Sequence, residues 1–268
     1  MRARSVGFTL AEMAIVLLVV GLLLGGMLST VSTQIDGRNN RDTLARLEQI
    51  KEALIGFAQA NGRLPCSADG TLATGAAGAG VEPAMVSNAC PTLAKYAVLP
   101  WITLGLPETD VWGRRFTYFV DASFADLNAK LTWTAACGAA PVPVPVAPTS
   151  FALCSTGSLS VVTKTPSNKT PTPTSGIPAV IISHGRNGYG AYTSSGQLYG
   201  VLPATTTDEY GNTPTAATST FYSREQSPQP SGSCSDTAAG VFCEFDDLVA
   251  YIPVSVLVTR MVAAGRLP

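Results

Sequence analysis

The stretch GFTLAEMAIVLLVVGLLLGGML, residues 7–28, decides how this chain is built. After Glu12, the run from Met13 to Leu28 contains 16 residues without a charge. A carboxylate beside so apolar a segment costs about 2.5–3.5 kcal/mol where the surroundings are hydrocarbon, so a chain that carries one there usually provides a partner for it. Glu12 is therefore the first candidate functional residue.

The same run is long enough to cross a membrane. From Phe8 to Val31 there are 24 residues, about 36 Å of helix at 1.5 Å per residue, against a hydrocarbon core of about 30 Å. Arg2 and Arg4 precede the run, and basic residues favour the cytoplasmic side. We therefore expect a single-pass helix, with the N-terminus cytoplasmic and the rest of the chain on the outer side.

The junction before the apolar run resembles the processing signature of type IV pilins and type II secretion pseudopilins. A short basic leader ends in Gly7, followed by Phe8, Thr9, Leu10, one variable residue and Glu12. The resemblance implies that the helix lies in a bacterial inner membrane, single-pass, with the N-terminus cytoplasmic and the head periplasmic. It further implies that a prepilin peptidase cuts between Gly7 and Phe8 and methylates the new amine of Phe8. It also implies that Glu12 meets the terminal amine of a neighbouring subunit in a helical filament, since either charge alone in a low-dielectric core would lack a partner.

Two glycines of the apolar run are candidate assembly residues. Gly21 stands where many pilins carry glycine, and Gly25 follows four residues later. Small residues at this spacing let helices approach closely. Ser29 departs from the pattern, because major pilins commonly have proline at this position.

Two other kinds of N-terminal segment share some of these features. An ordinary secretory signal has an apolar core of about 7–15 residues, and the 16-residue run is longer. A membrane-anchored periplasmic binding or adhesin domain that does not polymerise is the alternative function, because it has the same expected topology. Only the Gly7–Phe8 junction and Glu12 distinguish a filament subunit from such an anchored domain.

After the apolar run, the hydrophobic period stays helical. Apolar residues recur at intervals of three and four, at Leu44, Leu47, Ile50, Leu54 and Phe57. Charged residues occupy the other positions, as expected for a helix with one buried face. We expect one helix from Phe8 to about Ala60, ended by Asn61, Gly62 and Pro65, with its second half packed on a globular head.

These observations divide the chain into four parts. They are a leader over 1–7, a transmembrane or filament-core half-helix over 8–31, an amphipathic half-helix over 32–62 and a globular head over 63–268. The expected fold is α+β and pilin-like, with an antiparallel sheet, disulfides and long loops in the head. Short β-rich runs predict strands at 114–120, 131–134, 159–162, 179–183 and 248–252.

The rest of the head is predicted to be loops and one closing helix. Small-residue, Pro-rich or Thr-rich sequence predicts surface loops at 70–80, 141–148, 163–176 and 205–233. Near the end, apolar residues fall at helical spacing at Val254, Leu257, Val258, Met261 and Val262. Because Gly265 follows them at a suitable capping position, we expect a short helix docked on the sheet.

Six cysteines follow the apolar run: Cys66, Cys90, Cys137, Cys154, Cys234 and Cys243. An even number without a C-x-x-C pair, on the expected outer side, favours disulfides over a metal or redox site. Pairing of sequence neighbours closes the smallest loops. That hypothesis joins Cys66 to Cys90, Cys137 to Cys154, and Cys234 to Cys243.

The sequence does not indicate an enzyme. His184 is the only histidine, and no nucleophile motif such as G-x-S-x-G surrounds it, so we expect a turn histidine bonded to backbone. A net charge of −1 argues against a nucleic-acid partner, which would need a basic patch. No catalytic residue and no cofactor are therefore predicted.

Calcium is the one metal for which the sequence offers weak candidates. Asp208 with Glu209, and Asp246 with Asp247, supply the hard oxygen ligands that calcium takes, although no EF-hand spacing is present. The resemblance adds that major pseudopilins hold calcium in a carboxyl-terminal loop.

The expected function is that of a structural subunit, a minor pilin or pseudopilin of a type IV filament or a type II secretion pseudopilus. Its expected partners are other pilin or pseudopilin subunits, prepilin peptidase, an inner-membrane assembly platform and membrane lipid. The sequence leaves open whether the filament is a surface pilus or a secretion pseudopilus. The size and loop content of the head favour a minor subunit over a major one, and its ligand is not indicated.

Overall fold

The structure is a computed structural model of the whole chain. It describes residues 9–91, 96–127, 149–165, 168–216, 218–238 and 240–267, and it gives no side-chain surroundings for 23–33 and 166–172. The chain divides into two compact units, Met1–Asp42 and Thr43–Pro268.

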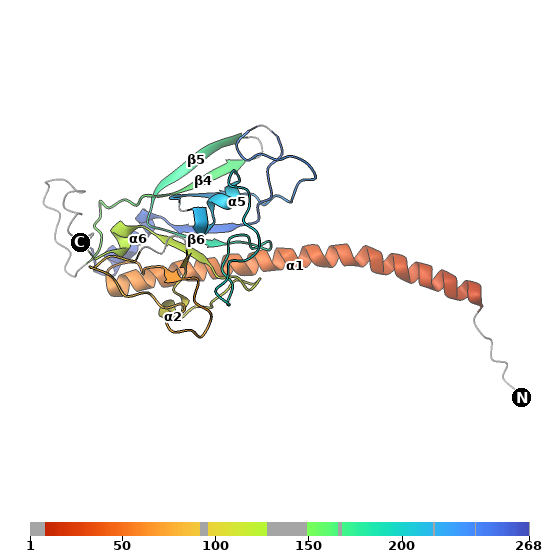
Figure 1. Cartoon of the computed structure of the whole chain (residues 1–268), viewed down its shortest axis with the longest axis horizontal. Helices are drawn as coiled ribbons and strands as arrows, with labels where there is room; N and C mark the ends of the chain where they lie inside the picture. The colour runs from red at the N-terminus through yellow and green to blue at the C-terminus, as the bar shows by residue number, and fades with distance from the viewer. Residues whose placement is uncertain are drawn as a thin grey trace, which may run out of the picture. The chain divides into compact units, whose positions relative to one another are not determined.

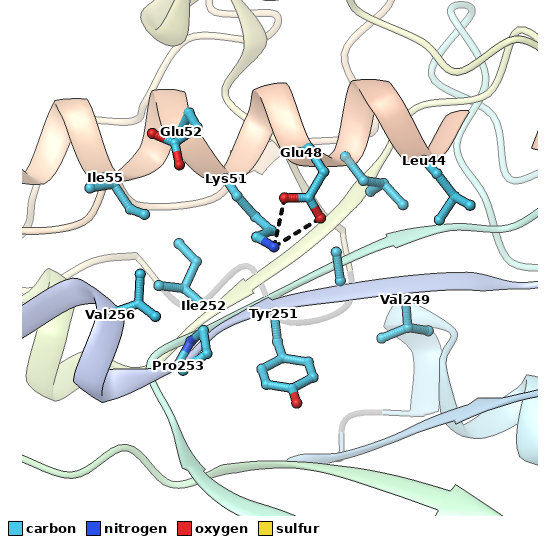
Figure 2. Close-up of a pocket in the computed structure, with 12 residues that line it drawn as sticks. Leu44, Glu48, Lys51, Glu52, Ile55, Val249, Tyr251, Ile252, Pro253 and Val256 are labelled. Atoms are coloured by element: carbon cyan, nitrogen blue, oxygen red, sulfur yellow. Dashed lines mark hydrogen bonds and ion pairs between the residues drawn. The ribbon is translucent and has the colours of Figure 1, made fainter. Parts of the chain in front are cut away.

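The longest element is the helix α1, which runs over Leu10–Asn61 and contributes to both units (Figure 1). In the second unit its buried side includes Leu47, Ile50 and Leu54. Leu44 (Figure 2), the first residue of the predicted apolar stripe, is 48 % exposed, so Leu47 is the first residue of that stripe to be buried. The helix ends at Gly62, which takes a φ of +74°, a left-handed conformation that glycine adopts without the strain a side chain would bring.

The predicted membrane crossing is not found. Over the described residues, none of the helices combines the length and the apolar character that crossing a membrane takes. The predicted transmembrane half-helix over 8–31, and the single-pass inner-membrane localisation that followed from it, are therefore wrong.

The second unit contains a five-stranded sheet with the order β1-β2-β3-β6-β8, in which every pair is antiparallel. Its strands are β1 (Ala68–Asp69), β2 (Ala97–Val98), β3 (Thr117–Val120), β6 (Ala179–Ser183) and β8 (Leu248–Ile252). The bounds of β6 and β8 match the prediction. β3 begins later than the predicted 114, because a turn closed by the Asp110 N–H and the Arg114 carbonyl uses the preceding residues.

A second sheet has the order β5-β4-β7 and lies in the same unit (Figure 1). Its strands are β4 (Leu159–Thr165), β5 (Asn168–Ile177) and β7 (Thr220–Arg224). β4 pairs with β5 in antiparallel fashion and with β7 in parallel. The stretches 163–176 and 205–233, predicted as loops, therefore contain strands. Threonine favours strands, and the prolines of β5 are tolerated because it is an edge strand.

Short helical turns connect these strands: α2 (Trp101–Leu104), α3 (Ala122–Ala125), α5 (Asp208–Gly211) and the 3₁₀ turn η2 (Pro214–Ala216). The stretch 70–80 is a loop, as predicted. The predicted strand 131–134 and the predicted loop 141–148 lie outside the described residues.

The head is layered, with the five-stranded sheet in the middle. One face of the sheet packs against α1 and the closing helix α6 (Val254–Ala263), in a cluster that includes Leu54, Ile181, Ile252 and Met261. The other face packs against the second sheet, where the rings of Phe119 and Phe221 lie 4.7 Å apart. Full burial of one such side chain is worth about 1.5–3 kcal/mol, so both interfaces stabilise the head.

The closing helix and two disulfides follow the predictions. α6 is followed by Gly265, whose φ is +67°. Disulfides join Cys66 to Cys90 and Cys234 to Cys243, with Cα atoms 5.5 and 4.9 Å apart. Cys154 is also disulfide-bonded, and its predicted partner, Cys137, lies outside the described residues.

Candidate functional site

The first candidate site is the start of α1, where Glu12 has a local partner. The backbone N–H and the hydroxyl of Thr9 each donate to Glu12 Oε2 at 2.8 Å, and the Glu12 N–H donates to the Thr9 hydroxyl at 3.3 Å. This is a capping box, in which a threonine and a glutamate three residues later satisfy each other's free N–H groups at a helix start. These hydrogen bonds from Thr9 lower the pKa of the Glu12 carboxyl, so it is ionised at neutral pH.

Sequence reasoning missed this local role of Glu12, although the signal was present. Thr9-Leu10-Ala11-Glu12 has the T-x-x-E spacing of a capping box. Only one carboxylate oxygen is used: Glu12 Oε1 receives no hydrogen bond from any residue that the structure describes. The two processing residues, Gly7 and Phe8, lie outside the described residues.

The helix that follows Glu12 presents large apolar side chains to solvent. Those more than 60 % exposed are Leu10, Ile15, Leu17, Leu18 and Leu22. Consecutive residues from 15 to 20 are all at least 44 % exposed, so every side of the helix is apolar and open. A Cβ built on Gly21 would meet no atom within 4 Å, and the surroundings of Gly25 lie outside the described residues.

The second candidate site is a group of three carboxylates in the head. Glu209 lies on α5, while Asp246 and Asp247 immediately precede β8. One oxygen from each lies within 4.8 Å of the others. The structure thus brings together three of the four predicted calcium candidates. The fourth, Asp208, faces a different set of partners.

Burial and mutual repulsion make this group hard to ionise fully. Burial, followed by the charge of Asp247, raises the pKa of Glu209 to about 9, against the opposing effect of a hydrogen bond from the Asn187 side chain at 2.5 Å. Burial also raises the pKa of Asp246 to about 6, although the Asn187 N–H donates to it at 2.8 Å. At neutral pH without a cation, Glu209 therefore keeps its proton.

Two oxygens of the group make no hydrogen bond of ordinary geometry among the described residues. They are Asp246 Oδ1 and Asp247 Oδ1, both buried, and Asp247 is only 3 % exposed. His184 Nδ1 lies 3.5 Å from Asp247 Oδ1 and likewise makes no hydrogen bond there. Buried polar atoms are nearly always satisfied, so such a pair calls for an explanation. A hard divalent cation fits this donor set, because calcium takes carboxylate oxygens from flexible positions.

His184 connects this group to the middle of the sheet. Its Nε2 lies 2.8 Å from the hydroxyl of Thr117, and its Nδ1 lies 3.5 Å from Asp247 Oδ1. The order hydroxyl, imidazole, carboxylate is that of a nucleophilic triad. Thr117 and His184 are both 0 % exposed, however, so the folded chain gives a substrate no access to the hydroxyl. His184 was expected to bond to backbone, and instead it contacts side chains.

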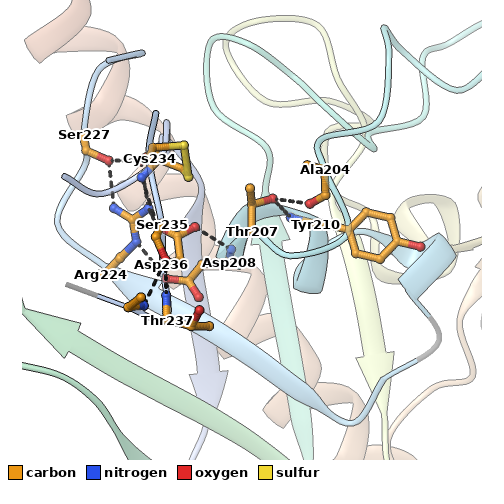
Figure 3. The surroundings of a disulfide bond; sticks show 12 residues. Ala204, Thr207, Asp208, Tyr210, Arg224, Ser227, Cys234, Ser235, Asp236 and Thr237 are labelled. Carbon is orange, nitrogen blue, oxygen red and sulfur yellow. Dashed lines mark hydrogen bonds and ion pairs between the residues drawn. A yellow bond between two sulfur atoms is a disulfide. The ribbon is translucent and has the colours of Figure 1, made fainter. Parts of the chain in front are cut away.

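Asp208 belongs to a buried ion-pair network beside the Cys234–Cys243 disulfide (Figure 3). Its carboxylate lies 2.5 Å from Lys164 Nζ and 3.0 Å from Arg224 Nε. Arg224 also reaches Asp236 Oδ1 at 3.2 Å. Two cations and two anions balance here, so the network is a structural element and leaves no charge for a ligand.

No protein-family model, curated protein or solved structure matches the chain. The exposed apolar helix and the carboxylate group are two places where the described part of the molecule leaves physical demands unmet.

Proposed function

We propose that this chain is a structural subunit of a type IV filament or a type II secretion pseudopilus, assembled through the N-terminal part of α1. The observation that carries the proposal is the apolar surface of residues 10–22, which is exposed on every side of the helix. Isolated exposed apolar residues are common on proteins, but a continuous apolar surface is typical of an interaction site. Here the cover would be the same helix from neighbouring copies, in the repeated contact that builds a filament.

The charge of Glu12 at the start of the helix would fix how neighbouring helices are aligned along their length. Cleavage between Gly7 and Phe8 would create an amine whose ordinary pKa is about 7.7–8.0, so most of it is protonated at neutral pH. Glu12 Oε2 is held by Thr9, while Oε1 accepts nothing from the described residues. One carboxylate can therefore cap its own helix and bind the Phe8 amine of a neighbouring subunit at the same time.

The substitution Glu12→Gln tests the pairing separately from the cap. Glutamine serves in a capping box as glutamate does, but it has no charge to pair with an amine. We expect Glu12→Gln and Glu12→Ala both to lower filament yield by about tenfold or more, the factor that corresponds to about 1.4 kcal/mol. The measurement is filament recovery and electron microscopy in a host that carries the assembly machinery.

Two controls accompany this experiment. Glu48→Gln changes an exposed glutamate of the same helix, in the other unit, and should leave filament yield unchanged. Mass spectrometry of the mature N-terminus should find a methylated Phe8 in all variants. Normal filaments from Glu12→Gln would mean that Glu12 only caps the helix, and an uncut leader would remove the proposal altogether.

We also propose that Glu209, Asp246 and Asp247 hold calcium or a similar hard divalent cation in the head. The two unpartnered Oδ1 atoms support it, because a cation would satisfy both. When bound, the ion would offset two of the three carboxylate charges and hold α5 against the start of β8, and it would supply no reaction.

Thermal melting with calcium tests this second proposal. A cation at about 100 times its Kd stabilises the folded state by about 2.7 kcal/mol, and one kcal/mol moves the Tm of a chain of 150–250 residues by about 2–4 °C. We therefore expect the Tm to be about 5–10 °C higher in calcium than in EDTA. Glu209→Gln should reduce this difference, whereas Glu225→Gln, an exposed control, should not. An identical Tm in calcium and EDTA would contradict the site.

A further inference from the structure

The inference concerns the disulfide between Cys234 and Cys243, which joins two segments that reach the carboxylate group proposed above to hold a cation. On one side, Asp246, a member of that group, stands three residues after Cys243. On the other side, Asp236 stands two residues after Cys234 and binds the helical turn α5, which carries Glu209. Each half of the carboxylate group is therefore connected to one side of the disulfide.

Asp236 holds the first residue of α5. Its Oδ2 accepts a hydrogen bond from the Asp208 N–H at 2.8 Å. Asp236 is only 1 % exposed, so solvent does not compete for this bond. The N–H groups at a helix start have no partner within the helix, and a carboxylate that accepts from one of them fixes where the helix begins. Because Glu209 is the next residue of α5, Asp236 also determines where the Glu209 carboxyl stands.

The same carboxylate binds the other side of the disulfide. Asp236 Oδ1 accepts a hydrogen bond from the Cys243 N–H at 3.0 Å. One side chain thus bridges α5 and the segment that leads to Asp246, where the disulfide keeps the Cα atoms of its two cysteines 4.9 Å apart. Beyond Cys243, the buried Phe245 exchanges two backbone hydrogen bonds with Ser227, of 2.9 and 3.0 Å. These bonds fix the segment up to the residue before Asp246.

Two buried cations fasten this bridge to the second sheet. Arg224 of β7 donates through Nη2 to Asp236 Oδ1 at 3.2 Å and to the Cys243 carbonyl at 3.0 Å. Lys164 of β4 donates to the Asp236 carbonyl at 2.9 Å. Figure 3 shows Arg224 and Asp236 next to the disulfide. The contacts of Arg224 span both sides of the disulfide, so they depend on the two sides staying together.

The Cys234–Cys243 disulfide is open to attack by a thiol. Cys234 is exposed, whereas Cys66 of the Cys66–Cys90 disulfide is fully buried. Reduction begins when a thiolate attacks a disulfide sulfur that it can reach, and a mixed disulfide forms. With dithiothreitol, the second thiol of the reagent then closes the reagent's own disulfide ring. Two electrons and two protons pass to the protein, and both cysteines become thiols.

We propose that closure of the Cys234–Cys243 disulfide and cation binding at the carboxylate group are coupled, with Asp236 as the positioning residue between them. This inference rests on the cation site proposed above. The closed disulfide holds Glu209 and Asp246 at a spacing that one ion bridges, so it raises the affinity for the cation. Coupling between two sites is reciprocal, and a bound cation therefore makes the disulfide harder to reduce by the same factor. The head binds its cation most tightly in an oxidising compartment, where disulfides persist.

The first test compares the calcium affinity of the head with and without this disulfide. Isothermal titration calorimetry measures calcium binding to the purified full chain, kept in a mild detergent because of its exposed apolar helix. The double variant Cys234→Ser/Cys243→Ser is measured in the same way. Coupled sites typically change each other's affinity by about 5- to 150-fold, so the Kd of the variant should be at least about fivefold higher.

The matched control is the double variant Cys66→Ser/Cys90→Ser. The N–H groups of these two cysteines donate to Glu82 and Asp126, so this disulfide is tied to a different part of the head. Its loss should leave the calcium Kd unchanged. Circular dichroism checks that both double variants fold.

The substitution Asp236→Asn tests the bridge itself. Asparagine has one acceptor oxygen where aspartate has two, so it cannot serve Asp208 and Cys243 through separate oxygens. Alone, Asp236→Asn should raise the calcium Kd at least about fivefold. Added to Cys234→Ser/Cys243→Ser, it should raise the Kd little further, because substitutions that cut one shared connection are not additive. Full additivity would overturn the role given to Asp236.

The second test needs no substitution. The full chain is equilibrated in mixtures of reduced and oxidised dithiothreitol, with saturating calcium or with EDTA, and alkylation with mass spectrometry reads the state of each disulfide. With calcium, the midpoint for Cys234–Cys243 should move to a more reducing mixture, by the factor that separates the two Kd values of the first test. The midpoint for Cys66–Cys90 should not move. An equal shift of both disulfides would assign the effect to general stabilisation by calcium and overturn the coupling.

The outcomes distinguish failure of the coupling from failure of the cation site. Absence of calcium binding to the oxidised full chain would remove the site, and the coupling with it. Calcium binding of equal strength with and without the Cys234–Cys243 disulfide would leave the site in place and overturn the coupling alone. If Cys234→Ser/Cys243→Ser does not fold, the second test on the unaltered chain decides.

Discussion

Two carboxylates of this chain, Glu12 and Glu209, lie in opposite electrostatic surroundings. Glu12 is exposed, and donors from Thr9 lower its pKa. Glu209 is buried beside Asp246 and Asp247, and its pKa rises to about 9. The first is a fixed negative charge at any physiological pH, whereas the second loses its proton only at alkaline pH or to a cation.

The raised pKa of Glu209 predicts the direction in which pH changes the stability of the cation-free protein. A carboxyl with a folded pKa of about 9 and an ordinary value of 4.5 stabilises the fold fully below pH 4.5, and this contribution is lost as pH rises through about 9. In EDTA, the Tm should therefore fall between pH 5 and pH 9. Relative to Glu209→Gln, we expect a loss of at least ~1 kcal/mol, or about 2–4 °C.

The comparison with Glu209→Gln removes the contributions of all other titrating groups. Asp246, whose pKa is raised to about 6, works in the same direction at lower pH. Thermal melts in EDTA at pH 5, 7 and 9 suffice. Parallel pH profiles of the two proteins would show that Glu209 is not buried in the way described.

The sequence predicted which acidic residues are available but not which of them meet. Asp208 and Glu209 are adjacent on α5, and neighbouring positions on a helical turn point about 100° apart. Asp208 therefore faces Lys164, while Glu209 faces Asp246. Strand β7 and a loop separate Glu209 from Asp246 in the sequence. Only the paths of β7 and β8 bring these groups together, and no local pattern encodes those paths.

At the scale of elements, the predictions succeeded where apolar runs had clear ends. β6 and β8 are continuous apolar segments bounded by turns, and both were predicted to the residue. β5 was missed because its Thr and Pro residues read as a loop. Its strand state comes from pairing with β4, and tertiary pairing of this kind overrides weak local preference.

The seam between α1 and the sheet predicts a clear contrast between two leucines. Leu54 is 0 % exposed in the main core cluster, whereas Leu44 is 48 % exposed. Leu54→Ala should cost about 2–5 kcal/mol, because it removes buried methyl groups and leaves a cavity. Leu44→Ala should stay within about 1 kcal/mol. Urea unfolding followed by circular dichroism measures both, and equal losses would show that the helix does not pack through this face.

At the scale of the whole molecule, the chain joins a stable head to a helix stretch that finds no cover in its own fold. The sequence predicted both parts, and it predicted a bilayer around the second. That last prediction is wrong. The described helices do not meet the requirements of a membrane crossing.

Substitutions at two glycines of α1 distinguish an effect on filament assembly from an effect on folding. A side chain built on Gly21 or on Gly56 would meet no atom within 4 Å in the single chain. Gly21→Leu and Gly56→Leu should therefore both leave the Tm within about 2 °C. If helices of neighbouring subunits pack closely at Gly21, Gly21→Leu alone should abolish filaments, since small residues permit that approach. Filaments from Gly21→Leu would place the close contact elsewhere.

The parallel pairing of β4 with β7 has a consequence for the order in which the head matures. β4 ends at Thr165, but its parallel neighbour begins only at Thr220, after β5, β6 and α5. A chain delivered from its N-terminus onward must hold β4 with one side unsatisfied until that later segment arrives, and distant pairings of this kind form slowly. During biosynthesis, the second sheet therefore stays incomplete until β7 has been made, and in that interval the open side of β4 is accessible to chaperones and proteases.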